Sequence, residues 1–302
     1  MGRQGVADIG VPCVTQKCFD EVMTIDAIAT IREETERSVA ALASTAPDQQ
    51  VPTCPDWTAD DLLWHLAEVH EFWAAILEAG ATTQEQVMAI EEGRAERPVE
   101  REALLARRSA ATEALLAQLA AHADEDPAWF WYSAFQGVGI TRRMQTHEAT
   151  IHRVDAELTA GRPVIPIAPQ VAADGLAHVL EVMWPAGFEW IPDWATTRPV
   201  AAVEIVPDGG TARWIEISRW SGTRPRDGKE FDAPVARLLP PGRPAGDLPR
   251  ARAAGTAQAL DLWAWGREQA LAHLGEEAQR VALQGDSAAL AQLEELIAEG
   301  HD

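Results

Sequence analysis

One stretch of the sequence, residues 142–158, most constrains what this chain can fold into. At about 100° per residue, its large apolar side chains form one stripe of a helix, made by Met144, Ile151 and Leu158. Glu148 and His152 lie on the same face, four residues apart, so their side chains meet one turn apart. An unpaired buried carboxylate is energetically costly, so burial of Glu148 beside His152 requires a compensating partner. A divalent metal bound by both side chains would be such a partner.

A third metal ligand must come from another part of the chain. His147 does not complete an H-E-x-x-H zinc signature, because that motif needs two histidines four apart on one face. His147 and His152 are five apart and point in well-separated directions. His65 is the better candidate, because it lies on the apolar face of a second predicted helix, three residues after Leu62 and four before Val69.

The N-terminal half predicts amphipathic helices joined by mostly short links, which describes a four-helix bundle. The predicted helices cover residues 22–42, 58–80, 99–121 and 142–158. Thr58 is a natural N-cap for the second helix, with Asp61 as the acidic member of a capping box. Residues 123–138 are polar and aromatic, and they either plug the end of the bundle, the commoner arrangement, or line the mouth of a site.

Three prolines within residues 163–169 mark a stiff linker to a smaller α+β domain. We therefore predict a two-domain fold of class α plus α/β. It consists of a flexible extension (residues 1–20), a four-helix bundle (21–162), the linker (163–169) and an α+β domain (170–302). Within the second domain, helices are predicted at 171–183, 257–267 and 287–299, a hairpin at 200–206 and 211–218, and a short strand at 250–253. Residues 221–249 are rich in Pro, Gly and Arg and give no firm prediction.

Charge and cysteine content exclude several classes of protein. The net charge is −22, whereas binding to nucleic acid or to an anionic membrane needs a basic face. The chain has no run of 18 apolar residues, and its first 20 residues lack the apolar core of a secretory signal. Three cysteines do not make a disulfide framework, so we expect a cytoplasmic protein. Cys13 and Cys18 have no second pair, which argues against a metal knuckle.

The predicted metal ligands are His65, Glu148 and His152, on two helices of one bundle. Two imidazoles and one carboxylate suit zinc with an open fourth position, and the same set would also hold ferrous iron. Asp155, one turn beyond His152, is the predicted acceptor that fixes the tautomer of His152. The alternative is that His65 is a hydrogen-bonded core histidine and that Glu148 and His152 are an ordinary helix pair.

Several segments of the chain match the pattern of a known family. They are C-P-D-W-T at residues 54–58, D-L-L-W-H-L at 61–66, H-E-A-T-I-H-R-V-D-A-E at 147–157, and G-T-A through L-W-A-W-G-R within residues 255–267. In combination they resemble the mycothiol-dependent maleylpyruvate isomerase family. The resemblance implies a DinB-like four-helix bundle that binds a divalent metal, usually zinc, through His65, Glu148 and His152. It also implies a second domain of sterol-carrier-like α/β form and the low-molecular-weight thiol mycothiol as co-substrate.

Thiol chemistry follows from such a site as a hypothesis. A free thiol is mostly protonated at neutral pH, and coordination to a dication makes it a thiolate nucleophile. Addition of the thiolate to an activated double bond permits rotation, and elimination then returns the trans isomer; a substrate with a leaving group undergoes thiol transfer instead. Arginine matches carboxylate geometry, so the candidates for binding thiol and substrate are Arg142, Arg143 and Arg153, and the candidate catalytic residues are Arg267 and Asp155. The alternative role for each arginine is a surface salt bridge.

Two other functions stay open at this point. A metal hydrolase would need a general base near the metal, and Asp155 is the only nearby candidate. A non-catalytic metal-binding or stress-response protein would need a fourth protein ligand, which His147 or His70 would have to provide. The expected partners are a small-molecule thiol and an electrophilic substrate, and the expected assembly is a monomer or a homodimer.

Overall fold

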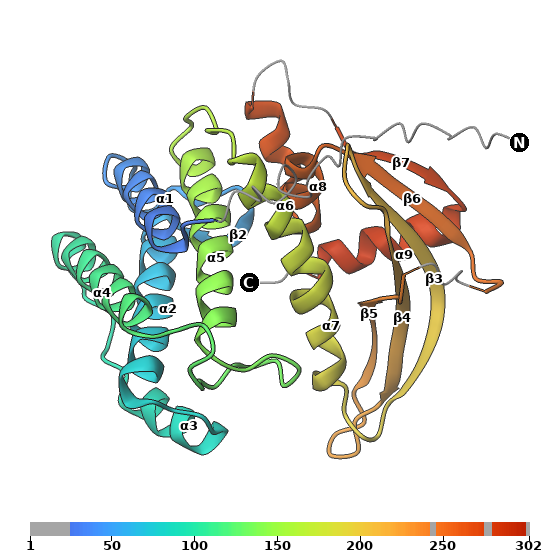
Figure 1. The fold of residues 1–302 in the computed structure, drawn as a ribbon, viewed down its shortest axis with the longest axis horizontal. Coiled ribbons are helices and arrows are strands. Elements are labelled where there is room, and N and C mark those ends of the chain that lie inside the picture. Colours follow the sequence, from blue (N-terminus) through green and yellow to red (C-terminus); the bar gives the residue numbers. More distant parts are fainter. Residues whose placement is uncertain (1–24, 242–245, 275–279, 300–302) are drawn as a thin grey trace, which may run out of the picture.

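The structure is a computed structural model that describes residues 25–241, 246–274 and 280–299. A helical region from the N-terminal half lies beside a β-sheet from the C-terminal half, as Figure 1 shows. This mixed architecture agrees with the predicted combination of a helical part and an α+β part. The predicted extension at residues 1–20, with Cys13 and Cys18, lies outside the described residues.

Four long helices make up most of the helical region: α1 (Ala27–Leu42), α2 (Ala59–Ala79), α4 (Arg101–Ala121) and α5 (Val138–Thr159). They match the four predicted helices, except that α1 begins later and α5 begins earlier than expected. Helix α1 packs on α5, and α2 packs on α4. Helix α5 is buried along nearly its whole length, because α1, α2 and α6 (Pro169–His178) all contact it.

The predicted capping box fixes the start of α2. The Thr58 hydroxyl accepts a hydrogen bond from the Asp61 backbone N–H at 3.3 Å, and the Asp61 carboxylate accepts one from the Thr58 backbone N–H at 2.8 Å. The helix ends at Gly80, whose φ of 59° lies in the left-handed region that favours glycine. Ahead of α2, a two-stranded antiparallel ribbon of β1 (Gln50–Val51) and β2 (Cys54–Thr58) was not predicted.

The aromatic segment at residues 123–138 packs into the helical region rather than standing free. Phe130 is buried, and its ring stacks on Trp73 with centroids 5.5 Å apart. Trp129 also stacks on Trp73, at 5.9 Å. An unpredicted helix, α3 (Gln84–Glu92), packs on α2 nearby.

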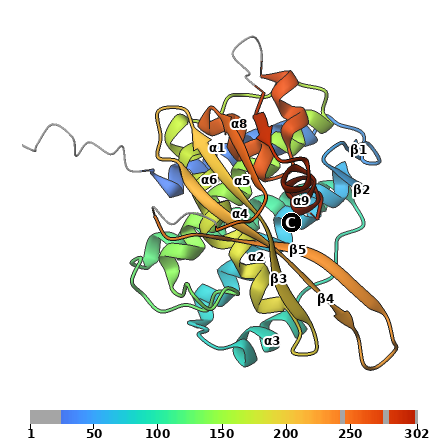
Figure 2. The same ribbon diagram turned by 90° about the vertical axis from the view of Figure 1, so that its right-hand side faces the viewer.

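A five-stranded sheet in the order β5-β4-β3-β6-β7 forms the C-terminal half. Its strands are β3 (Thr196–Pro207), β4 (Arg213–Thr223), β5 (Glu230–Leu238), β6 (Arg250–Gly255) and β7 (Ala282–Gly285). The predicted hairpin is confirmed as β3 and β4, and the predicted short strand is β6, which pairs parallel to β3. The prediction did not include β5 or β7. Figure 2 shows this sheet in front of the helical region.

The remaining helices and short helical turns lie between α5 and β3, between β6 and β7, and after β7. They are α6 (Pro169–His178), a π-helical turn (Val179–Met183), α7 (Trp184–Ala186), a 3₁₀ turn (Gly187–Trp190), α8 (Ala257–Ala264), a second 3₁₀ turn (Glu268–His273) and α9 (Ser287–Ala298). The predicted helix at residues 171–183 is thus α6 continued by the π-helical turn. In the part of the chain that the structure describes, no helix is long and apolar enough to cross a membrane.

One hydrophobic core is shared by the two halves of the chain. Ile151 and Val154 of α5 belong to the same buried cluster as Val203 of β3. Val164 and Ile167, from the proline-rich segment, are buried in this cluster too. Helix α5 therefore carries two of the three metal-binding candidates, Glu148 and His152, and also packs against the sheet region.

Candidate metal centre

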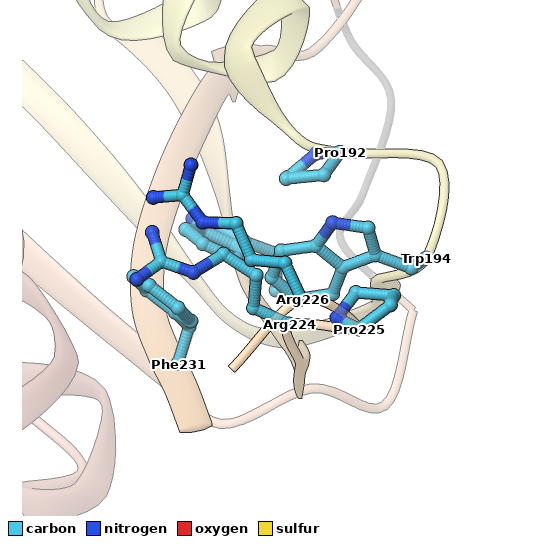
Figure 3. Close-up of a pocket in the computed structure, with 7 residues that line it drawn as sticks. Pro192, Trp194, Arg224, Pro225, Arg226 and Phe231 are labelled. Atoms are coloured by element: carbon cyan, nitrogen blue, oxygen red, sulfur yellow. The ribbon is translucent and has the colours of Figure 1, made fainter. Parts of the chain in front are cut away.

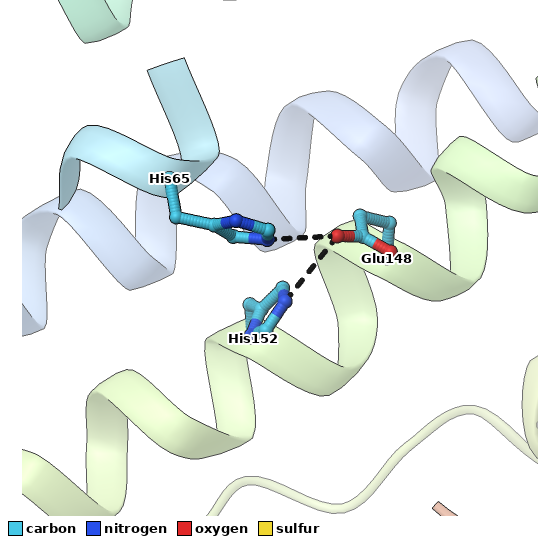
Figure 4. A group of neighbouring side chains, drawn as sticks. All are labelled: His65, Glu148 and His152. Atoms are coloured by element: carbon cyan, nitrogen blue, oxygen red, sulfur yellow. Dashed lines mark hydrogen bonds and ion pairs between the residues drawn. The ribbon is translucent and has the colours of Figure 1, made fainter. Parts of the chain in front are cut away.

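The structure brings together the three side chains that the sequence singled out. His65 Nε2 lies 3.1 Å from Glu148 Oε1, and His152 Nε2 lies 3.3 Å from the same oxygen. Figure 4 shows His65 extending from α2 toward Glu148 and His152, which sit one turn apart on α5. One potential ligand atom from each of the three residues lies within 4.8 Å of the others.

The three side chains differ in exposure. The His65 side chain is 22% exposed, whereas those of Glu148 and His152 are 9% and 2% exposed. His65 is therefore the most exposed of the three candidate ligands, and the two on α5 are buried.

The donor set fits a divalent cation such as zinc. Zinc bound tetrahedrally at about 2.0–2.1 Å by N and O ligands separates neighbouring ligand atoms by about 3.3 Å. The two separations that involve Glu148, 3.1 and 3.3 Å, are close to this value. Three protein ligands leave a fourth position for another molecule.

Charge is concentrated in this buried group. Burial opposes ionisation of Glu148, but hydrogen bonds with His152 and His65 hold its pKa well below the usual range. Burial also opposes protonation of His152, but hydrogen bonds with Asp155 and Glu148 raise its pKa to about 10. A cation bound through Nε2 of His152 would displace a proton from that nitrogen, because a metal ligand must be deprotonated.

Asp155 holds the far side of the His152 ring. Its Oδ2 accepts a hydrogen bond from His152 Nδ1 at 2.8 Å, the contact expected of a residue that fixes the tautomer. The Thr53 hydroxyl donates to the other carboxylate oxygen at 2.5 Å. Although burial opposes its ionisation, Arg267 and His152 hold the pKa of Asp155 well below its usual range. With Nδ1 committed to Asp155, His152 presents Nε2 to Glu148.

Arg267 reaches the site from the C-terminal half of the chain. Its Nη2 donates to Asp155 Oδ2 at 3.0 Å and its Nε donates to Oδ1 at 3.2 Å. Nη1 donates to the Trp265 carbonyl at 2.7 Å, and the side chain is almost fully buried. In these contacts Arg267 acts on His152 through Asp155, so its position is that of a supporting residue.

Trp57 is a neighbour of the site that sequence reasoning missed. Its indole lies 4.6 Å from the His65 ring and 6.0 Å from the His152 ring, measured between centroids. It sits on β2 just before the capping residue of α2, within the C-P-D-W-T segment, which is the only sequence signal that pointed to it.

The other three candidate arginines are held by partners outside the metal site. Arg142 donates to backbone carbonyls and pairs with an acid, Arg143 bridges two carboxylates, and the fully buried Arg153 does the same. Arg142 contacts Leu119, His122 and Asp124, Arg143 contacts Asp174 and Glu181, and Arg153 contacts Glu34 and Glu157. None of these contacts joins an arginine to His65, Glu148 or His152, so binding of thiol by these arginines stays a prediction.

The two histidines considered as a fourth ligand are engaged elsewhere. His147 Nε2 lies 2.8 Å from Asp174 Oδ2 on α6. His70 Nδ1 accepts a hydrogen bond from Arg108 at 2.8 Å inside the helical region. Among the described residues, the cluster of potential metal ligands has three members.

A separate hollow of about 480 Å³ lies where β4 and β5 meet their connecting turn. Figure 3 shows Arg224 and Arg226 extending in the same direction beside the aromatic rings that line it. Arg224 is paired with Asp227 at 2.6 Å and lies over the Phe231 ring. The hollow includes none of the metal-site residues, and its aromatic rings pack on one another.

Comparison with known proteins identifies the N-terminal half. Residues 28–157, which include all three candidate ligands, match the family model of the mycothiol maleylpyruvate isomerase N-terminal domain. Two solved structures are similar: a mycothiol-dependent maleylpyruvate isomerase (12% identity, 85% of this chain and 91% of that chain covered, TM-score 0.49) and a histidine-to-alanine mutant of such an enzyme (13%, 80% and 88%, TM-score 0.47). No curated protein matches the chain. The family match therefore covers residues 28–157, the part of the chain that carries the three candidate ligands.

Proposed function

We propose that this chain is a metal-dependent enzyme that uses mycothiol to isomerise a small electrophile or to transfer the thiol to it. The convergence of His65, Glu148 and His152 carries the proposal, because it offers two imidazoles and a carboxylate to one ion. The family of the N-terminal domain supports mycothiol as the thiol. We further propose that the ion is Zn²⁺, that the helical region is a DinB-like four-helix bundle, that the sheet region is sterol-carrier-like, and that the enzyme is cytoplasmic.

Each residue of the site has a distinct task in this proposal. His65 and His152 would bind the ion through Nε2, and Glu148 through its carboxylate. The ion would supply Lewis acidity, which lowers the pKa of a thiol that reaches its open position. Asp155 keeps the proton on Nδ1 of His152, and Arg267 keeps Asp155 ionised and in place. The partly exposed His65 marks the side from which thiol and electrophile enter.

The hydrolase alternative has less support, because the general base it needs is committed elsewhere. Asp155 accepts hydrogen bonds from His152, Arg267 and Thr53, and its pKa lies well below the usual range. A carboxylate with so low a pKa is a weak base at neutral pH.

The structural-metal alternative also has less support. A structural zinc site is normally closed by four protein ligands. His147 and His70 would each have to leave a hydrogen-bond partner, Asp174 and Arg108 respectively, to become the fourth.

Metal analysis and calorimetry test the proposal directly. The wild-type chain should contain stoichiometric metal and bind mycothiol, whereas His65→Ala and Glu148→Ala should lose both. His122→Ala is the matched control, because His122 lies at the end of α4 and pairs with Asp126. Metal retained by both variants, or metal bound without affinity for mycothiol, would contradict the proposal.

Product analysis then separates isomerase from transferase. With maleylpyruvate and mycothiol, an isomerase returns the thiol unchanged and forms the trans isomer. A transferase consumes thiol and forms an adduct in equal amounts.

A further inference from the structure

A second hollow lies in the C-terminal half, between α6 and the turn that joins β3 to β4. Its volume is about 420 Å³, within the range of small-molecule pockets. It is lined by side chains from α6, from β3 and its turn, and from the starts of β4 and α8, and it includes none of the residues of the metal site.

The hollow exists because one apolar face of α6 and of the π-helical turn that continues it is only half covered. Ala173, Leu176, Ala177 and Leu180 follow the helical spacing of three and four and all line the hollow. Leu176 and Leu180 are buried against the sheet cluster, which also contains Ile205. Two members of the face are alanines, and they are too small to fill the space above them.

The facing turn does not fill this space either. It reads Pro207, Asp208, Gly209, Gly210, Thr211, and Gly209 adopts a φ of 68°, which favours glycine. Most of the residues that line the hollow are exposed or half-buried, so it is a groove open to solvent. An apolar molecule bound between α6 and the turn would remove the apolar surface of the helix face from water, which is favourable.

Arg213 supplies a cation at the wall of the hollow. Its Nη1 is bonded to Glu181 at 2.7 Å, and Glu181 is shared with Arg143, which lies 3.0 Å from its other oxygen. The Arg213 side chain is 38% exposed, and Glu181 is its only ion-pair partner within the described residues. A guanidinium has five N–H donors, so Arg213 can bind a further carboxylate.

Asp208 also lines the hollow and limits the charge of a ligand. Its carboxylate would repel a second negative group, which disfavours dicarboxylates. We propose that this hollow binds a small apolar monocarboxylate, with the hydrocarbon part against α6 and the carboxylate on Arg213.

Calorimetric titration with octanoate tests the assignment on the metal-loaded full chain. Octanoate should bind saturably at one site, and Ala177→Trp, which fills the hollow from a partly exposed position, should weaken binding at least tenfold. Arg213→Gln should weaken octanoate about tenfold and leave the binding of the uncharged octanol unchanged. Ala110→Trp, at an exposed position on α4, is the control and should bind octanoate like the wild type.

Each opposite result overturns part or all of the inference. No saturable binding to the wild type, or wild-type affinity in Ala177→Trp, removes the site. Undiminished octanoate affinity in Arg213→Gln removes the carboxylate assignment. Because none of these variants touches His65, Glu148 or His152, a failure here leaves the proposed thiol chemistry untouched, and loss of that chemistry leaves this test valid.

Discussion

At the scale of single residues, Asp155 contacts His152 Nδ1 and leaves Nε2 facing the other two proposed ligands. Asp155→Asn removes the negative charge that pairs with Arg267 and weakens the bond to His152 Nδ1. Loss of such a supporting contact typically costs 10–100-fold in metal affinity. We expect a decrease of about that size in a competition titration against a zinc chelator. Asp126→Asn, on the surface beside His122, is the control, and equal affinities of Asp155→Asn and the wild type would exclude this role for Asp155.

Asp261 on α8 is a buried acid whose pKa is raised well above the usual range by burial. The folded chain therefore holds this proton to a higher pH than the unfolded chain does, so the contribution of Asp261 to stability is full below its usual pKa of 3.8 and is lost as the pH rises. Asp261→Asn has the same shape and does not ionise, so it should raise the free energy of unfolding at pH 7 by about 1–2 kcal/mol. Urea unfolding at pH 4 and pH 7 measures the effect.

The pH dependence provides the control for Asp261. The increase in unfolding free energy caused by Asp261→Asn should be small at pH 4 and larger at pH 7. The same gain at both pH values would mean that ionisation of Asp261 is not the cause. Asp193→Asn, at an exposed position, should change stability at neither pH.

The three proposed metal ligands could be chosen from sequence because each broke a helical pattern. Glu148 and His152 are one turn apart, and His65 interrupts an apolar face, so helical geometry alone brings out these candidates. The contacts of Asp155 with Thr53 and Arg267 span 102 and 112 residues along the chain. Periodicity describes one element at a time, so it cannot show which distant segments meet.

At the scale of elements, the start of α2 positions His65. Thr58→Ala removes the hydroxyl that caps the helix, which should cost about 1 kcal/mol of unfolding free energy. Thermal and urea unfolding measure the loss. Thr83→Ala, which removes the corresponding cap of α3, is a matched control for the effect on metal affinity, because α3 carries no ligand. Only Thr58→Ala should lower both stability and metal affinity.

The acidic partner in the same cap predicts a pH effect. Burial opposes ionisation of Asp61, but hydrogen bonds with Thr58 and Arg97 lower its pKa to about 2. Its contribution to stability is therefore present above its usual value of 3.8 and is lost as the pH falls through about 2. Asp61→Asn should remove this part of the acid dependence, measured by thermal unfolding between pH 2 and pH 5. An unchanged acid profile would contradict it.

The elements that the sequence did not predict share a physical reason. Helix α3 buries only Val87, so it has no apolar stripe that periodicity could detect. Strand β7 is exposed along its length and is held mainly by backbone pairing with β6. Strand β5 lies in a stretch rich in Pro, Gly and Arg, and this composition gave no firm prediction of secondary structure. Elements that bury a regular face, such as α2, α5 and the β3–β4 hairpin, were predicted.

At the scale of the whole molecule, the proline-rich segment does not separate two independent cores. Val164 and Ile167 from that segment are buried in a cluster with Val154 of α5 and Val203 of β3. The Arg267–Asp155 pair adds a buried ionic link between the C-terminal half and the metal site. Stability of the sheet region and geometry of the metal site are therefore coupled through α5.

This coupling predicts one cooperative unfolding transition for the full chain. Circular dichroism, which follows the helices, and tryptophan fluorescence, which follows both halves, should give the same midpoint in urea.

A chain cut after residue 162 should lose cooperative unfolding and bind metal weakly, because the face of α5 with Ile151 and Val154 becomes exposed and Asp155 loses Arg267. Full-length Arg267→Met separates the two causes, since it removes the ionic link and keeps the apolar core. If Arg267→Met unfolds in one transition but binds metal as weakly as the truncated chain, the buried ion pair is what couples the sheet region to metal affinity. Two separate transitions in the wild type would instead mean that α5 belongs to the helical region alone.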